Sequence, residues 1–180
     1  QGDELEYFRQ QTKVRIVYQY EKNIRRSIGD KRNRLVKMAS HKIIASMDSD
    51  DIYLPTYLRY SVSALKEYKA GITSSASMLF LYPKQDYLLT GIRCGYARQG
   101  HEACCVFTKK HWKAMGGFIS KGQKSNQGEG VKMVEFHEKN YVNLDVGRLM
   151  ICVAHDTNTI NKDRFKDAKM DGEVKDLPHI

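Results

Sequence analysis

The sequence predicts a single α/β domain, in which a mainly parallel sheet is flanked by helices and joined by a small antiparallel portion. A chain of 180 residues, 41% of them hydrophobic, is long enough to bury a core of its own. Helix-like and strand-like patterns alternate over residues 3–80, as they do where helices join parallel strands. The second half carries several short strand-like runs in succession, which predicts the antiparallel portion.

Apolar spacing assigns the elements in order. Leu35, Val36 and Ala39 share one face of an expected helix over residues 31–39, with Asp30 as its N-cap. Further helices are expected over residues 3–11, 56–68, 111–115 and 131–139. Strands are expected over residues 14–18, 42–47, 72–77, 78–82, 87–92, 103–108, 142–146 and 149–154. We assign residues 1–160 to the domain and residues 161–180 to a polar C-terminal tail.

The chain is basic, with a formal net charge of +9, and residues 1–42 hold eleven Lys or Arg against five Asp or Glu. Such a surface favours polyanions: nucleic acid, anionic lipid or the diphosphate of a nucleotide. Because no RNP-like strand, zinc knuckle or basic recognition helix is recognisable, nucleic acid is not the expected partner. No apolar run suits a membrane span and no signal peptide is visible, so we expect a cytoplasmic protein, with contact to an anionic membrane as an option.

The four cysteines predict no disulfide and no zinc site. None belongs to a CxxC pair, and Cys104 and Cys105 are adjacent in a strand-like run. Adjacent strand residues face opposite sides of a sheet, so these two are poor disulfide partners. The pattern is typical of buried, reduced thiols.

Three carboxylates, Asp48, Asp50 and Asp51, directly follow the strand expected over residues 42–47. If the chain stays extended, Asp48 and Asp50 point the same way, and their repulsion favours a cation between them. Mg²⁺ and Mn²⁺ prefer such oxygen ligands and complete their shells with phosphates. The alternative is a turn with a helix cap. The carboxyl end of a strand is where open α/β sheets bind ligands, which favours the metal.

Four segments in order carry a resemblance to a known family. They are residues 29–34 (GDKRNR), 47–51 (MDSDD), 114–118 (AMGGF) and 128–130 (GEG). This set resembles the nucleotide-sugar glycosyltransferases of the GT-A fold, most closely glycosyltransferase family 2, over roughly residues 12–135. The resemblance implies a Rossmann-like GT-A domain. It also implies a metal-dependent inverting enzyme that moves a hexose from a UDP-sugar to a hydroxyl of a glycan, lipid or protein acceptor.

The resemblance also implies roles for the acidic residues. Mn²⁺ (or Mg²⁺) is the expected cofactor, and the UDP-sugar is the donor. Asp50 would ligate the metal directly, whereas Asp48 would reach the ribose or a metal-bound water. Asp51 would touch the sugar or hold the loop. His155, at the end of the strand over residues 149–154, is either a third metal ligand or a loop histidine bonded to Asp156.

Basic and amide side chains near the start of the helix over residues 31–39 are the expected donor-binding groups. Arg32 is the strongest candidate, followed by Asn33 and Lys31, because helix starts and cations favour anions. For Lys31 and Arg34 the alternative is a solvated helix face.

The family usually supplies its catalytic base as the Asp of an "ED" pair. Here the corresponding pair is Glu129-Gly130, so Glu129 is the expected base and Glu135 a second candidate. Trp112, Gly117 and Phe118 are the expected acceptor side, with core packing as the alternative for the two aromatic residues.

The opening βαβ unit that the resemblance implies is not recognisable in this sequence, so we expect either that the chain is a fragment of a longer protein or that other residues replace this unit. In the second case Tyr18 and Tyr20 are candidates to stack on the base. A basic nucleic-acid-binding module, or a catalytically degenerate transferase-like binding domain, remains the alternative function.

Overall fold

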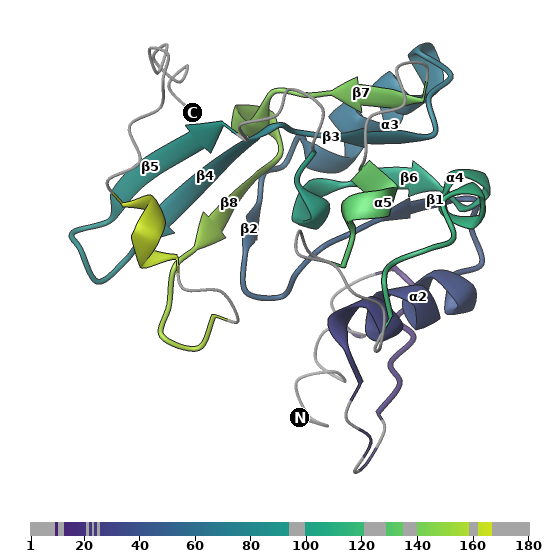
Figure 1. Ribbon diagram of the computed structural model, residues 1–180, viewed down its shortest axis with the longest axis horizontal. Coiled ribbons are helices and arrows are strands. Elements are labelled where there is room, and N and C mark those ends of the chain that lie inside the picture. The colour runs from purple at the N-terminus through teal and green to yellow at the C-terminus, as the bar shows by residue number, and fades with distance from the viewer. Residues whose placement is uncertain are drawn as a thin grey trace.

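A computed structural model describes residues 10, 13–20, 22, 24, 26–93, 100–120, 129–134, 140–158 and 162–166. These residues form a mixed α/β protein with two small four-stranded sheets (Figure 1). The first sheet has the order β1 (Ile43–Ala45), β6 (Val106–Thr108), β3 (Ile72–Ser74), β7 (Tyr141–Asn143). The second has the order β2 (Ile52–Tyr53), β8 (Met150–Val153), β4 (Ser77–Tyr82), β5 (Leu88–Arg93).

The mixed α/β class is confirmed, but the expected mainly parallel sheet is corrected. Within the described strands, only the β3–β7 and β4–β8 pairings are parallel. The other neighbours pair antiparallel, including both neighbours of β6. Apolar spacing shows which residues of a strand face the core, but it does not encode the direction of the partner strand.

The helices occur largely where their apolar faces predict them. The longest are α2 (Ile28–Met38) and α3 (Tyr57–Glu67), and short turns of helix make up α4 (Lys109–Ala114), α5 (Val131–Val134), η1 (Glu102–Cys104), η2 (Val146–Arg148) and η3 (Asp163–Phe165). α2 starts before its expected N-cap, because the Ser27 hydroxyl accepts from the backbone N–H of Asp30. In the described ranges, every helix is too short or too polar to cross a bilayer.

Two expected strands differ. Residues 13–20 contain no strand, and Val14, Val17, Tyr18 and Tyr20 are exposed. In the run over residues 103–108, η1 takes the first part and β6 begins only at Val106. The expected helix over residues 3–11 lies almost wholly outside the described residues, as do the second half of the helix over residues 131–139, including Glu135, and most of the tail.

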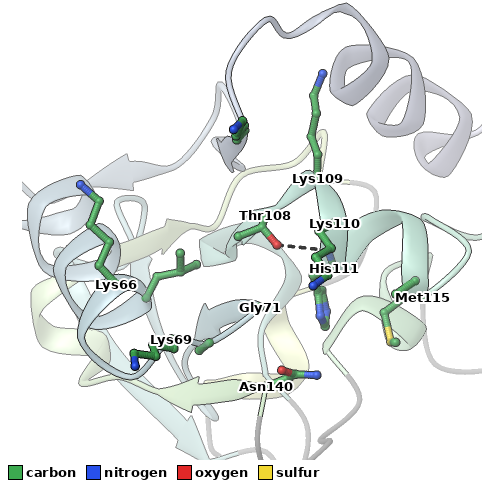
Figure 2. A pocket seen from close by; sticks show the side chains of 13 residues that line it. Lys66, Lys69, Gly71, Thr108, Lys109, Lys110, His111, Met115 and Asn140 are labelled. Carbon is green, nitrogen blue, oxygen red and sulfur yellow. Dashed lines mark hydrogen bonds between the residues drawn. The ribbon is translucent and has the colours of Figure 1, made fainter.

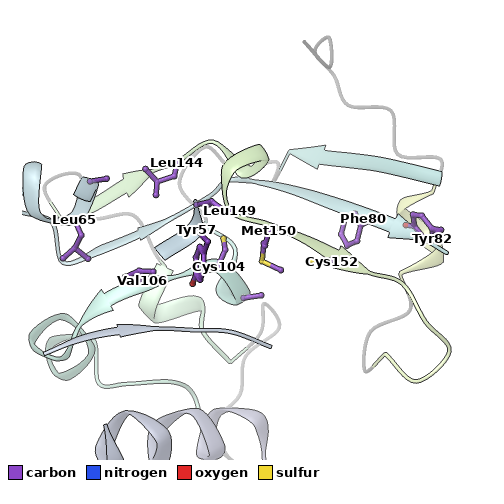
Figure 3. Close-up of a cluster of buried hydrophobic side chains, with 12 residues drawn as sticks. Tyr57, Leu65, Phe80, Tyr82, Cys104, Val106, Leu144, Leu149, Met150 and Cys152 are labelled. Carbon is purple, nitrogen blue, oxygen red and sulfur yellow. The ribbon is translucent and has the colours of Figure 1, made fainter. Parts of the chain in front are cut away.

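Both faces of the first sheet are covered. Adjacent residues of β6 face opposite ways, so Val106 joins the cluster under α3 while Phe107 joins a second cluster with Val36 of α2 and Phe118. The first cluster continues through Tyr57 into the second sheet, as Figure 3 shows. The two clusters therefore fix α2 and α3 on either side of β1 and the segment that follows it.

The described cysteines are buried thiols, as expected. They are Cys104, Cys105 and Cys152, whereas Cys94 lies outside the described residues. Cys104 and Cys105 belong to different clusters, which confirms that they face opposite sides. Burial raises the pKa of the Cys105 and Cys152 thiols to about 12, so both are protonated and unreactive at neutral pH.

Candidate active site

The acidic bend, residues 47–51, follows β1 and is held in place by two tyrosines, of which Tyr57 is buried and Tyr53 half-buried. The hydroxyl of Tyr57 donates to Ser46 O over 2.7 Å. The hydroxyl of Tyr53 accepts from Asp48 N over 2.7 Å and donates to Ala103 O over 3.0 Å. Burial raises the pKa of both phenols far above its ordinary value, so both remain neutral donors. The aromatic rings of α3 and β2 thus anchor a loop that carries three carboxylates.

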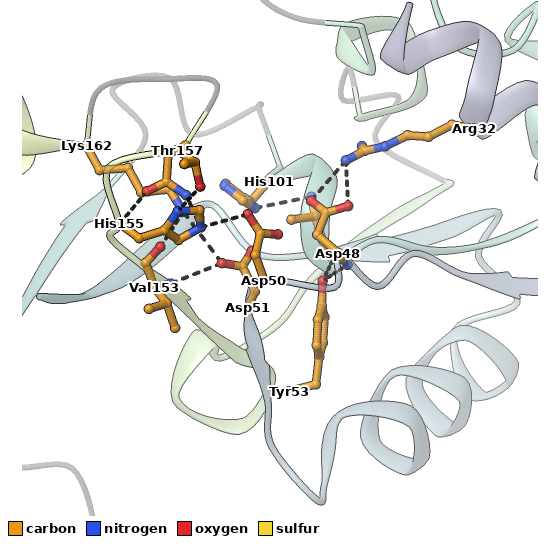
Figure 4. Close-up of polar contacts among 12 residues, drawn as sticks. Arg32, Asp48, Asp50, Asp51, Tyr53, His101, Val153, His155, Thr157 and Lys162 are labelled. Carbon is orange, nitrogen blue, oxygen red and sulfur yellow. Dashed lines mark hydrogen bonds and ion pairs between the residues drawn. The ribbon is translucent and has the colours of Figure 1, made fainter. Parts of the chain in front are cut away.

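The chain turns at residues 49–50 instead of staying extended. The rule that residues i and i+2 share a face therefore does not apply, and the expectation that Asp48 and Asp50 aim at one point is corrected. The alternative of a turn is what the structure shows. The accompanying helix cap is absent, because α3 is preceded by Thr56, whose side chain makes no cap hydrogen bond. Figure 4 shows the three carboxylates pointing in different directions.

Asp48 is paired with Arg32 of α2. The guanidinium Nη2 donates to both carboxylate oxygens of Asp48, over 3.0 and 3.1 Å. Burial raises the pKa of Asp48, because desolvation and the neighbouring Asp51 and Asp50 outweigh the attraction of Arg32. The geometry therefore places Arg32, the strongest donor-binding candidate, directly beside the acidic bend.

Arg32 also joins two glutamates. Its Nη1 lies 3.3 Å from Oε1 of Glu129 and 3.8 Å from Oε2 of Glu102, yet it makes no hydrogen bond with good geometry. Its guanidinium also lies 5.7 Å from the centre of the Phe118 ring. Desolvation would lower the pKa of Arg32, but the surrounding carboxylates raise it. The guanidinium thus lies among three carboxylates, and among the described residues its buried Nη1 has ion-pair contacts but no hydrogen bond.

Glu102 is the residue that the sequence reasoning missed. Burial, together with the charge of Glu129, raises the pKa of Glu102 to about 7. It lies in η1, one turn before a strand, where a single Glu among apolar residues gives no pattern to detect. A pKa of about 7 lies in the range that suits a general base at neutral pH.

Asp50 and His155 form the most metal-like pair. The His155 Nε2 lies 3.1 Å from the Asp50 Oδ2, and its Nδ1 lies 2.9 Å from the Thr157 hydroxyl. Burial alone would raise the pKa of Asp50, but the hydrogen bond with His155 and the charge of Lys162 lower it. Two neighbouring ligands of an octahedral ion with bonds of about 2.1 Å also lie about 3 Å apart, but the same Nε2 lies 2.7 Å from Asn158 Nδ2, so an ion at this pair would have to displace that amide.

The expected set of three metal ligands is not assembled. In the part of the chain that the structure describes, no three His, Cys, Asp or Glu side chains gather closely enough to hold a metal ion. Asp48 does not lie with the other two expected ligands, because its carboxylate pairs with Arg32. The fit to a divalent ion thus rests on Asp50 and His155, with the remaining positions open to phosphate and water.

Asp51 is a structural residue of the bend. Its side chain is only 5% exposed, its Oδ1 accepts from Val153 N over 3.0 Å, and the same oxygen lies 3.5 Å from Lys162 Nζ. These contacts are what we expect if Asp51 holds the loop and does not touch the sugar. The catalytic role of Asp51 stays a prediction, and nothing in its contacts supports it.

Asn33 joins α2 to the GGF segment, residues 116–118. Its Oδ1 accepts from Phe118 N over 2.8 Å and from Trp112 Nε1 over 2.9 Å. Its Nδ2 donates to Phe118 O over 2.8 Å and to Ser120 Oγ over 3.3 Å. Both acceptor and both donor positions of the amide are used, so Asn33 has no capacity left for a nucleotide. These contacts are those of a clamp, and the donor-binding role of Asn33 stays a prediction that they do not support.

The expected acceptor residues serve the packing of this segment. The Phe118 side chain is 2% exposed and packs edge-on against Phe107, with ring centres 5.9 Å apart, so core packing is the outcome for Phe118. Gly117 has φ +77°, and a Cβ there would lie 2.7 Å from Asn33 Oδ1. Trp112 is half-buried and bonded to Asn33. Lys31 is exposed on α2, which agrees with the alternative that it lies on a solvated helix face.

No model of a known protein family matches this chain, and no curated protein matches it either.

Proposed function

We propose that the protein is a metal-dependent inverting glycosyltransferase that transfers a hexose from a UDP-sugar to a hydroxyl group. The observation that supports it best is the pairing of Asp50 with His155, 3.1 Å apart, on the same bend whose Asp48 is paired with Arg32. In a chain of net charge +9, this end of β1 concentrates carboxylates, and a divalent cation would relieve their repulsion.

Each residue has a stated part in the proposal. Asp50 and His155 would hold Mn²⁺ or Mg²⁺, which supplies positive charge to a bound diphosphate. Arg32, whose buried Nη1 has no hydrogen bond among the described residues, would exchange part of its carboxylate contacts for a phosphate oxygen. Asp48, whose pKa burial raises, would accept a hydrogen bond from the ribose once Arg32 turns to the phosphate. Tyr53 would keep the bend in place throughout.

The transfer itself is a displacement at the anomeric carbon. Glu129, 22% exposed and 3.3 Å from Arg32, would take the proton from the acceptor hydroxyl. The hydroxyl oxygen then bonds to the anomeric carbon while the bond from that carbon to the diphosphate breaks, and the electron pair leaves with the diphosphate oxygen. Glu102, whose pKa is raised to about 7, is the carboxyl that would receive the proton from Glu129.

The test is the release of UDP from a panel of UDP-hexoses, with water as a stand-in acceptor and Mn²⁺ present. We expect the wild type to release UDP from at least one donor, and chelation of the metal to stop it. Glu129→Gln should slow release by a factor of about 100 or more, since removal of a general base costs that much. The matched control, Glu67→Gln, removes an exposed carboxylate of α3 and should leave the rate unchanged. UDP release no faster than in buffer for every donor would overturn the proposal.

A further inference from the structure

A hollow of about 540 Å³ lies among α3, α4 and the ends of the first sheet (Figure 2). Its lining combines five lysines with an apolar floor and a few neutral polar groups. The lining residues are Lys42, Leu65, Lys66, Lys69, Ala70, Gly71, Thr108, Lys109, Lys110, His111, Ala114, Met115 and Asn140. No aspartate or glutamate is among them, so the described wall of this lysine pocket has an uncompensated positive charge.

None of the five lysines has an ion-pair partner in the described ranges, and one of them, Lys109, is used by the fold. The ammonium of Lys109 donates to the carbonyl of Ala39, at the end of α2. Lys66 lies in the last turn of α3, where cations favour the helix carbonyls. The same explanation does not apply to Lys42, which precedes β1, or to Lys110, which lies in the first turn of α4. Among the described residues, no contact of these two side chains explains why they line the hollow.

The lysine pocket is separate from the candidate active site. Ile43, at the start of β1, pairs with Thr108 at the end of β6, and Thr108 lines the hollow. The acidic bend begins at the other end of β1, beyond Ala45. Ligands of the two sites would approach opposite ends of the same strand, so a ligand in the hollow is independent of the proposed transfer reaction.

We propose that the lysine pocket binds a small ligand that carries two or more phosphate groups. A volume of about 540 Å³ is that of a small-molecule site, and lysines on flexible stems suit clustered phosphate charges. Asn140 is exposed and adds a neutral donor, since no hydrogen bond of its side chain is seen among the described residues. The apolar floor under Leu65 and Met115 accommodates the uncharged part of the ligand. The phosphates belong either to a soluble compound or to a lipid headgroup.

The experiment measures binding of inorganic triphosphate and of vesicles made of phosphatidylcholine with a phosphoinositide bisphosphate. The wild type is compared with the triple variant Lys66→Gln/Lys69→Gln/Lys110→Gln, which removes exposed charges and leaves Lys109 in place. We expect micromolar binding of at least one probe by the wild type. The triple variant should weaken it at least about tenfold, because each exposed charge pair contributes modestly.

The matched control is Lys37→Gln/Lys113→Gln/Lys132→Gln, which removes the same charge from exposed positions that do not line the hollow. Its affinity should stay within about threefold of the wild type, since only long-range charge is lost. Binding of triphosphate identifies a soluble ligand, and binding of vesicles alone identifies a headgroup. Equal weakening by both triple variants, or no binding of either probe, would overturn the proposal.

Asp50→Asn separates this site from the proposed transferase. The substitution should leave triphosphate binding without metal unchanged, because Asp50 lies beyond the other end of β1. A loss of metal-free binding in this variant would contradict a separate pocket, whereas failure of UDP release in the wild type would leave the pocket standing.

Discussion

Replacing Asn33 with Ala removes the clamp between α2 and the GGF segment, residues 116–118. Three hydrogen bonds of 2.8–2.9 Å are lost, together with a longer one to Ser120. Each good bond contributes about 1 kcal/mol net, which gives about 3 kcal/mol. The higher helix propensity of Ala offsets about 0.5 kcal/mol of this loss in the free energy of unfolding. We therefore expect the free energy of unfolding to fall by about 2–3 kcal/mol.

Urea denaturation measures this change, with the slope on urea concentration unchanged if the variant stays two-state. The control is Asn140→Ala, which removes an exposed amide without a side-chain hydrogen bond among the described residues and should cost less than about 0.5 kcal/mol. A loss of less than about 0.5 kcal/mol in Asn33→Ala, combined with weaker UDP binding, would refute the clamp and restore the donor-binding role.

Three further predictions concern the same region. Burial and the charge of Glu129 raise the pKa of Glu102 to about 7, so the folded state holds the proton of this carboxyl more tightly than the unfolded state does. The free energy of unfolding should therefore fall as pH rises from about 4.5 to about 7. Glu102→Gln should remove that fall in denaturation curves taken across this range. Gly117→Ala should lower the melting temperature more than Gly116→Ala, because both have positive φ but only at Gly117 would the Cβ meet another side chain within 3 Å; equal shifts would refute the close approach. Tyr53→Phe leaves two backbone groups without their partner and should cost about 1–3 kcal/mol in denaturant unfolding, whereas no change would show that its hydroxyl does not hold the bend.

The sequence predicted the helices with continuous apolar faces and the strand that leads into the acidic bend. α3 is the clearest example, since Leu65 and its neighbours repeat at helical spacing and pack on β3 and β6. β2 was not predicted, because two residues, Ile52 and Tyr53, are too few to show any period. It exists because it pairs with β8, about a hundred residues later in the chain.

The sequence selected Arg32, Asp50 and His155 as candidates, and the structure places all three around the same bend. Their functional roles stay predictions. The sequence did not indicate that Asp48 would pair with Arg32 or that Asn33 would bond to the GGF segment, because both contacts depend on how α2 packs. Long-range contacts of this kind leave no local pattern in the sequence.

The most direct measurement of the central claim is the electron paramagnetic resonance of Mn²⁺ titrated with the protein in the presence of UDP. If Asp50 and His155 hold a divalent ion, the signal of free Mn²⁺ should fall with the wild type and remain with Asp50→Asn. Asp86→Asn, which changes an exposed carboxylate in the turn between β4 and β5, should behave like the wild type. If the free Mn²⁺ signal stays unchanged with the wild type, or falls equally with Asp50→Asn, the acidic bend does not bind the metal.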